Sequence, residues 1–335
     1  MLSNGVLKKL DVIISVLFRF LKFFSFGKDS DKCLVIRPGG MGDLVLFDLA
    51  IRNADLDVDS FIFAIQKRAE PWAKFRDLNY VLLDANFFKF MFFSKHRFVI
   101  CSEQFFASAA DFSRFFLRKD SCLIGFDSNK RANIFTRQID YDENLHESKN
   151  FQKLLNELPR LSIKSSVPKM NVSIIRNSDY CVLAIGGTDS ESRNLDVERW
   201  LFLVKALNKE NLPIYLTHSP QDWRIAEQLS RAMTISRIAN SFQESIEFIQ
   251  GSAYLISVDS GMVHVASFFN VPARVLFTSA NVVKWRPTAS SSWVLSHDFE
   301  CQPCGKFGQV PKCLYSFRCT KNLDLAKVHS DFLNN

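Results

Sequence analysis

A glycine-rich turn near the start of the chain ends in a carboxylate. The segment Gly39-Gly40-Met41-Gly42-Asp43 follows the apolar run 33–36 and precedes a second apolar series, which indicates a strand, a turn and a helix. Glycines allow a sharp turn and a close approach to a ligand, and the amides of a helix start favour anions. Asp43 could take a proton from a hydroxyl group or could only cap the helix, and spacing alone favours the cap.

A second polar group follows an apolar run in the other half of the chain. In Asp259-Ser260-Gly261-Met-Val-His264, the first residues stand where a helix start would present its amides, and His264 lies one helical turn beyond Ser260. A diphosphate would meet the positive end of the helix dipole there, and Asp259 could bind sugar hydroxyls. A Ser-His hydrolytic pair lacks the expected elbow pattern around the serine.

A third turn comes earlier in the same half. The apolar run 181–185 leads into Gly186-Gly-Thr188, and Arg193 follows five residues later. The planar guanidinium of arginine suits a diphosphate. Arginine in a loop is otherwise simply solvated.

Eight cysteines fall into two groups. Cys33, Cys101, Cys122 and Cys181 stand singly in apolar runs and are expected to be reduced, buried residues of a cytoplasmic protein. Cys301, Cys304, Cys313 and Cys319 are crowded into one loop-rich segment with the spacing C-x₂-C-x₈-C-x₅-C. Four thiolates at such spacing could close a structural zinc or iron site without a role in bond breaking.

The elements that must position these residues alternate between strand and helix. Strands are expected at 60–65, 80–83, 98–101, 180–185, 213–217, 253–258 and 273–277, with helical segments between them, including 71–78 and 105–117. Such alternation predicts an α/β protein with parallel sheets. A proline-bounded polar stretch at 159–168 separates two halves of similar size, and the default site is the cleft between them.

The composition supports a folded, two-domain chain with an anionic partner. Of 335 residues, 47% are hydrophobic and 23% are charged, which excludes disordered and collagen-like classes. The net charge of +7 favours anionic partners such as nucleotides, phosphorylated glycans, acidic lipids or nucleic acid, and it is too small to choose among them. The segment 7–24 has a narrow polar stripe that interrupts its apolar residues, so we expect either a helix at a membrane surface or a helix packed on the protein body.

Together these motifs resemble the heptosyltransferases of glycosyltransferase family 9. The run Ile36-Arg-Pro-Gly-Gly-Met-Gly-Asp-Leu-Val-Leu46 looks like the opening signature of that family, and 258–266 is similar to its donor-site pattern Asp-Thr/Ser-Gly-x-x-His-x-Ala. The resemblance implies a GT-B fold, with two Rossmann-like domains whose parallel sheets face each other across a cleft. It assigns 31–160 to an acceptor domain and 172–325 to a donor domain, and the amphipathic N-terminal segment, 1–30, precedes them.

The resemblance also implies roles for individual residues. Asp43 matches the catalytic base of an inverting transfer, and Gly40, Met41 and Gly42 match the acceptor-side loop. The donor-site positions are Thr188, Arg193, Asp259, Ser260, Gly261 and His264. Family members move heptose from ADP-heptose to a lipopolysaccharide or lipooligosaccharide core and require no metal for catalysis. The partners expected are therefore a nucleotide sugar, a lipid-linked or core oligosaccharide and the inner face of the inner membrane, with no nucleic acid.

Two departures and two alternatives bear on the donor. Arginine stands at 193 where the family often has lysine, which keeps the charge, and 277–280 reads Phe-Thr-Ser-Ala where the family often has Gly-Pro-Thr. A different nucleotide sugar, used for surface glycans or protein glycosylation, is one alternative. A non-catalytic nucleotide-sugar-binding protein is the other. A nicotinamide oxidoreductase is disfavoured because Val45 stands where the last glycine of G-x-G-x-x-G belongs.

Overall fold

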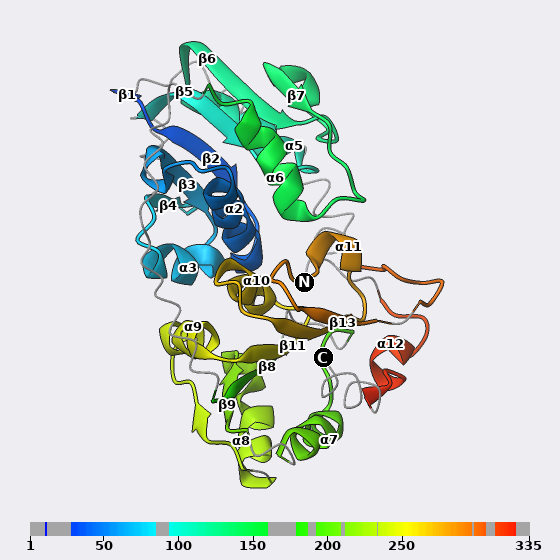
Figure 1. The fold of residues 1–335 in the computed structure, drawn as a ribbon. Helices are drawn as coiled ribbons and strands as arrows, with labels where there is room; N and C mark the ends of the chain where they lie inside the picture. The colour runs from blue at the N-terminus through cyan, green and yellow to red at the C-terminus, as the bar shows by residue number, and fades with distance from the viewer. Residues whose placement is uncertain are drawn as a thin grey trace. The chain divides into compact units, whose positions relative to one another are not determined.

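The computed structural model describes residues 11, 28–84, 94–159, 179–186, 192–208, 212–232, 234–296, 298–305 and 312–325. The chain forms two compact units, Met1–Met170 and Asn171–Asn335, here called unit 1 and unit 2. The division falls in the interval between the two predicted domains. Figure 1 shows that each unit is built around its own twisted sheet with helices on its faces.

Unit 1 has a parallel sheet with the strand order β4-β3-β2-β5-β6-β7, and β1 also pairs with β5. Its strands are β1 (Lys28–Ser30), β2 (Cys33–Arg37), β3 (Phe61–Ile65), β4 (Tyr80–Leu82), β5 (Ser94–Cys101), β6 (Leu117–Phe126) and β7 (Arg137–Ile139). Its helices are α2 (Met41–Asn53), α3 (Glu70–Phe75), α5 (Ala107–Ser113) and α6 (Glu147–Asn156).

Helices cover both faces of this sheet, as the buried, nearly continuous apolar strands require. Helices α2 and α6 lie side by side (Figure 1), where Phe47 and Phe151 meet with ring centroids 5.0 Å apart. Phe47 also contacts Phe63 of β3. Side chains alternate along a strand, so Ala64 faces the other way, into the cluster that includes Ala110 of α5.

Unit 2 repeats the plan with the strand order β10-β9-β8-β11-β12-β13, again parallel throughout the described strands. Its strands are β8 (Cys181–Ile185), β9 (Ile214–His218), β10 (Arg237–Ile238), β11 (Tyr254–Val258), β12 (Ala273–Leu276) and β13 (Trp293–Leu295). Its helices are α7 (Val197–Asn208), α8 (Trp223–Ala232), α9 (Phe242–Gly251), α10 (Gly261–Phe268), α11 (Val282–Trp285) and α12 (Arg318–Lys321).

The core of unit 2 lies between its sheet and the α7–α8 pair. Cys181 and Ile185 of β8 pack there with Trp200 of α7 and Leu229 of α8. Helices α9 and α10 contact each other over the opposite face (Figure 1). Within the residues that the structure describes, no helix is long and apolar enough to cross a membrane.

Both sheets have a point at which the strand order reverses. In unit 1 the chain builds outward from β2 through β3 and β4 and then returns to place β5 on the other side of β2. In unit 2 the corresponding neighbours are β8 and β11. Open parallel sheets bind ligands beyond the carboxyl ends of the strands at such a point. Each unit therefore has one preferred position for a site.

Candidate active site

Asp43 lies in the first turn of α2, which follows the carboxyl end of β2. Its carboxylate accepts a hydrogen bond from Gly40 N (2.7 Å) through Oδ2 and pairs with Arg37 Nη2 through Oδ1. A Cβ atom at Gly39 would lie 2.5 Å from Asp43 Oδ2, so a larger residue there would displace the carboxylate from its present position. The aspartate thus caps α2, as spacing suggested, and its side chain is still 22% exposed. It can reach a ligand as well as the helix.

Arg37 ties the turn to the neighbouring strand. Its Nη1 donates to Ser102 O at 3.0 Å, directly beyond β5, and its guanidinium lies over the ring of Phe151 with 5.0 Å to the centroid. Burial by itself would lower the pKa of Arg37, but Asp43, Glu147 and Glu103 together raise the pKa above its ordinary value. Arg37 is therefore a permanent cation at the point of strand reversal.

Glu103 is a second carboxyl group near Asp43. Burial raises the pKa of Glu103, whereas Arg37 and the amides of Phe105 and Phe106 lower it. Its Oε1 accepts hydrogen bonds from Phe105 N (2.9 Å) and Phe106 N (3.3 Å). No role was predicted for Arg37 or Glu103, although Arg37 ends β2 and Glu103 lies two residues beyond β5.

The matching position in unit 2 holds an arginine and an aspartate. Arg193 Nη1 lies 3.5 Å from Asp259 Oδ2, and the two side chains are 14% and 10% exposed. Arg193 belongs to the connection after β8, and Asp259 directly follows β11. Burial raises the pKa of Asp259, and Arg193 lowers it. This ion pair spans the two strands between which the sheet order reverses.

The start of α10 completes this group. Ser260 is the N-cap residue, but its side chain does not cap the helix and instead shares a hydrogen bond with Ser257 Oγ (3.0 Å). Gly261 begins the helix. His264 is buried, with its ring 5.9 Å from that of Trp285 on α11. Trp285 could not be predicted from a local pattern, because only the fold brings the two residues together.

The connection after β8 is described at its two ends only. Gly186 has a φ of +92°, and an added Cβ would lie 1.9 Å from Asp222 Oδ2, so glycine is required there. Thr188, predicted to bind the donor, lies outside the described residues. Arg193, Asp259, Ser260, Gly261 and His264 all lie in unit 2 around the carboxyl ends of β8 and β11.

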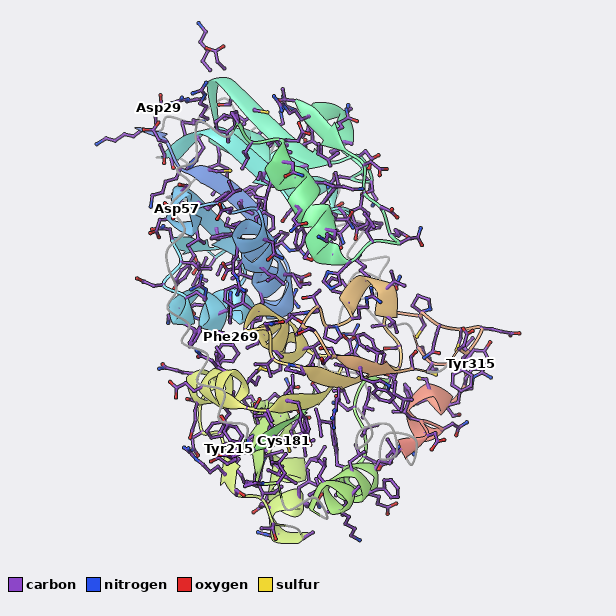
Figure 2. All side chains as sticks on the ribbon, viewed as in Figure 1. Asp29, Asp57, Cys181, Tyr215, Phe269 and Tyr315 are labelled. Atoms are coloured by element: carbon purple, nitrogen blue, oxygen red, sulfur yellow. The ribbon has the colours of Figure 1, made fainter. Side chains whose placement is uncertain are left out.

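The four C-terminal cysteines share one neighbourhood at α12, which contains Cys319 and lies close to Tyr315, labelled in Figure 2. Burial raises the pKa of the Cys304 thiol, Cys301 and Cys313 raise it further, and Arg193 lowers it. Cys313 Sγ accepts hydrogen bonds from the amides of Tyr315 (3.4 Å) and Phe317 (3.3 Å). Among the described side chains, however, no three His, Cys, Asp or Glu residues are arranged to hold a metal ion.

A family model identifies the chain. Residues 119–314, more than half of the chain, match glycosyltransferase family 9 (heptosyltransferase). The chain belongs to this family, and it is a glycosyltransferase. No curated protein matches it.

Solved structures agree with the fold of this family. The glycosyl transferase family 9 protein of Veillonella parvula is 14% identical, with a TM-score of 0.62 over 82% of this chain and 90% of its own. E. coli heptosyltransferase WaaC with ADP-2-deoxy-2-fluoro heptose is 14% identical, with a TM-score of 0.61 over 80% of this chain and 93% of its own. The iron-containing dodecameric glycosyltransferase TibC from enterotoxigenic E. coli is 12% identical, with a TM-score of 0.53 over 92% and 76%.

These findings confirm three predictions: the family, its two-domain α/β fold of the GT-B type, and the glycosyltransferase class of enzyme. The residue roles, the donor, the acceptor and the location in the cell are not decided by them and remain predictions.

Proposed function

We propose that this glycosyltransferase moves a heptose from ADP-heptose to a lipopolysaccharide or lipooligosaccharide core acceptor. The observation that carries the proposal is the Arg193–Asp259 pair beside the start of α10. A cation and a helix start together suit a diphosphate, and the carboxylate suits sugar hydroxyls. The relative WaaC binds an ADP-heptose analogue, which supports this donor for the present chain.

In the proposed reaction, Asp43 removes the proton from the attacking acceptor hydroxyl. The hydroxyl oxygen forms a bond to the anomeric carbon as the bond from that carbon to the diphosphate oxygen breaks. Arg37 and the Gly40 amide hold the carboxylate of Asp43 in one orientation, so it meets the hydroxyl already aligned. A single displacement of this kind inverts the anomeric centre.

Departure of ADP leaves negative charge on the diphosphate. Arg193 and the amides at the start of α10 would stabilise this charge, and Arg193 would exchange its contact with Asp259 for one with the phosphates. Charge-assisted hydrogen bonds of this type are worth about 1.5–3 kcal/mol. No metal ion is needed in this scheme.

The cysteine segment and the membrane enter as separate proposals. We expect Cys301, Cys304, Cys313 and Cys319 to hold a structural zinc or iron ion, on the ground of their spacing. We also expect the enzyme to work in the cytoplasm at the inner face of the inner membrane, where its acceptor would be lipid-linked.

The decisive experiment is a thermal-shift panel of nucleotide sugars, because donor binding stabilises the fold whatever the acceptor is. ADP-heptose and ADP should raise the melting temperature, and UDP- and GDP-sugars should not. A shift with a UDP- or GDP-sugar alone would instead favour another glycosyl donor. A shift with ADP-heptose but no transfer to any core acceptor would favour a non-catalytic binding protein.

A further inference from the structure

The cysteine segment is hydrogen-bonded to the loop that follows β12. Gln302 Nε2 donates to Thr278 O, and Gly305 N donates to Ser279 O at 3.0 Å. Gln302 Oε1 in turn accepts from Phe299 N at 3.1 Å. The side-chain amide of Gln302 is therefore fixed at both its nitrogen and its oxygen.

The same loop is bonded to the residue that precedes Arg193. Thr278 Oγ1 donates to Ser192 O, and Ser192 Oγ donates to Ser279 Oγ at 3.2 Å. The exposed fractions of Thr278, Ser279 and Ser192 are 1%, 0% and 2%. Water cannot replace a bond lost here without local rearrangement, so breaking one leaves a buried polar group unsatisfied.

The chain of bonds ends at the proposed donor site. Ser192 is joined by one peptide bond to Arg193, whose guanidinium lies against Asp259. Gly186 and Ser192 follow β8, Thr278 follows β12, and Asp259 follows β11. The hydrogen bonds and the ion pair therefore join three loops at the carboxyl ends of these strands. Holding the backbone at Ser192 limits the positions that the guanidinium of Arg193 can reach.

We propose that Thr278 and Gln302 are positioning residues for donor binding, which hold the backbone before Arg193 so that its guanidinium is ready for the diphosphate. This inference rests on the proposed donor site. Binding is tighter when the binding group is ordered beforehand, because the ordering cost is not met at the moment of association. Neither residue needs to touch the nucleotide.

The test measures ADP affinity by calorimetry in five variants of the full chain. Thr278→Val removes the bond to Ser192 O, and Gln302→Met removes the bond to Thr278 O. Each is expected to weaken ADP binding about tenfold, the size of one lost hydrogen bond. Thr217→Val is a matched control, because it removes an equally buried bond to Ser245 Oγ (2.9 Å).

The second control is Gln243→Met, which loses an exposed bond to Glu247 (3.1 Å). Melting curves establish that every variant is folded. Thr278→Ser keeps the hydroxyl group and should bind ADP with the affinity of the wild type. The proposal is overturned if Thr278→Val and Gln302→Met bind ADP as wild type does, or if Thr217→Val weakens binding as much as Thr278→Val. Failure of the wild-type chain itself to bind ADP would instead refute the donor site.

Discussion

Arg37 Nη1 donates a hydrogen bond to the carbonyl oxygen of Ser102 at 3.0 Å, across the two strands between which the order of the unit 1 sheet reverses. In unit 2, the Arg193–Asp259 pair spans the corresponding strands. The carboxyl ends of diverging strands leave room for a ligand at such a point. In each unit, therefore, an arginine that pairs with an aspartate lies at the position where the sheet can accept a ligand.

Replacing Asp43 tests the proposed base. We expect Asp43→Asn to lower turnover by about 10²–10⁴-fold, the usual contribution of general-base catalysis, because an amide cannot accept the proton. ADP affinity should stay within about threefold of wild type, since the lost carboxylate belongs to unit 1 and the donor site to unit 2. Single-turnover transfer and calorimetry measure the two quantities.

Asp57→Asn is the matched control for this prediction. Asp57, labelled in Figure 2, also accepts a backbone hydrogen bond at the start of a helical turn, from Asp59 N at 3.0 Å. Its replacement should leave transfer unchanged. Wild-type turnover by Asp43→Asn would remove Asp43 from the mechanism.

Replacing Arg193 or Asp259 tests the donor site. Arg193→Ala should weaken ADP and ADP-heptose about 10–100-fold, because the diphosphate loses charge-assisted hydrogen bonds. Asp259→Ala should weaken ADP-heptose more than ADP, since its expected partners are sugar hydroxyls. Arg231→Ala is the control, as Arg231 is exposed and pairs only with Glu227 among the described residues. Unchanged donor affinity in both site variants would move the nucleotide elsewhere.

Much of the fold could be predicted from the sequence because its strands are short, buried and apolar. The strand expected at 253–258 is β11, from Tyr254 to Val258, and the turn at Gly39–Asp43 joins a strand to a helix as expected. Such features depend on neighbours in the chain. The expected helix at 105–117 was wrong in part, because its end is the short turn Arg114–Phe116 and β6 begins at Leu117.

The candidate site was less predictable, because its contacts join distant parts of the chain. Arg37 meets Ser102 across 65 positions, and Thr278 meets Ser192 across 86. No local pattern specifies either pair. Leu117 suits a helix or a strand, so its state is set by pairing with His96 of β5 rather than by propensity.

The cysteine spacing gives a prediction about metal content. Protein purified without chelator or affinity metal should contain about one zinc or iron per chain, bound by the four thiolates. Replacing Cys304 with serine should lower that content and the melting temperature, whereas Cys122→Ser, outside the segment, should leave the metal in place. A metal-free wild-type chain with four titratable thiols and undiminished stability would contradict the prediction.

Because His96 is buried, we expect the stability of the folded chain to depend on pH. Its side chain is fully buried, with Nδ1 2.8 Å from Lys32 O, and burial lowers the pKa of His96 below its ordinary value of 6.5. His96 therefore binds a proton more readily in the unfolded chain than in the folded one. The stability that the neutral, buried His96 contributes is fully present above pH 6.5 and is lost as the pH falls toward the lowered pKa. The free energy of unfolding should decrease by up to about 1.4 kcal/mol per pH unit below 6.5. Urea titrations of wild type and His96→Gln should differ in this slope, and equal slopes would refute it.

Asp11, in the N-terminal segment, contacts the start of α5. Its carboxylate is buried and accepts hydrogen bonds from Ala107 N (3.1 Å) and Ser108 N (2.8 Å), the first amides of α5. Phe106, the N-cap residue, makes no side-chain bond to the helix, so Asp11 supplies the cap. At this point the segment packs on the protein, one of the two arrangements left open by its sequence.

This contact and membrane binding can be separated by experiment. Asp11→Ala should lower the free energy of unfolding by about 1 kcal/mol, the usual worth of a helix cap, and Asp31→Ala, which changes an exposed aspartate, should not. A chain that begins at Lys28 loses the same cap and should lose as much stability. If the segment also anchors the enzyme, that shortened chain binds anionic liposomes less than Asp11→Ala does, with a salt-sensitive difference. Equal binding by the shortened and full chains would leave the segment with a role in stability alone.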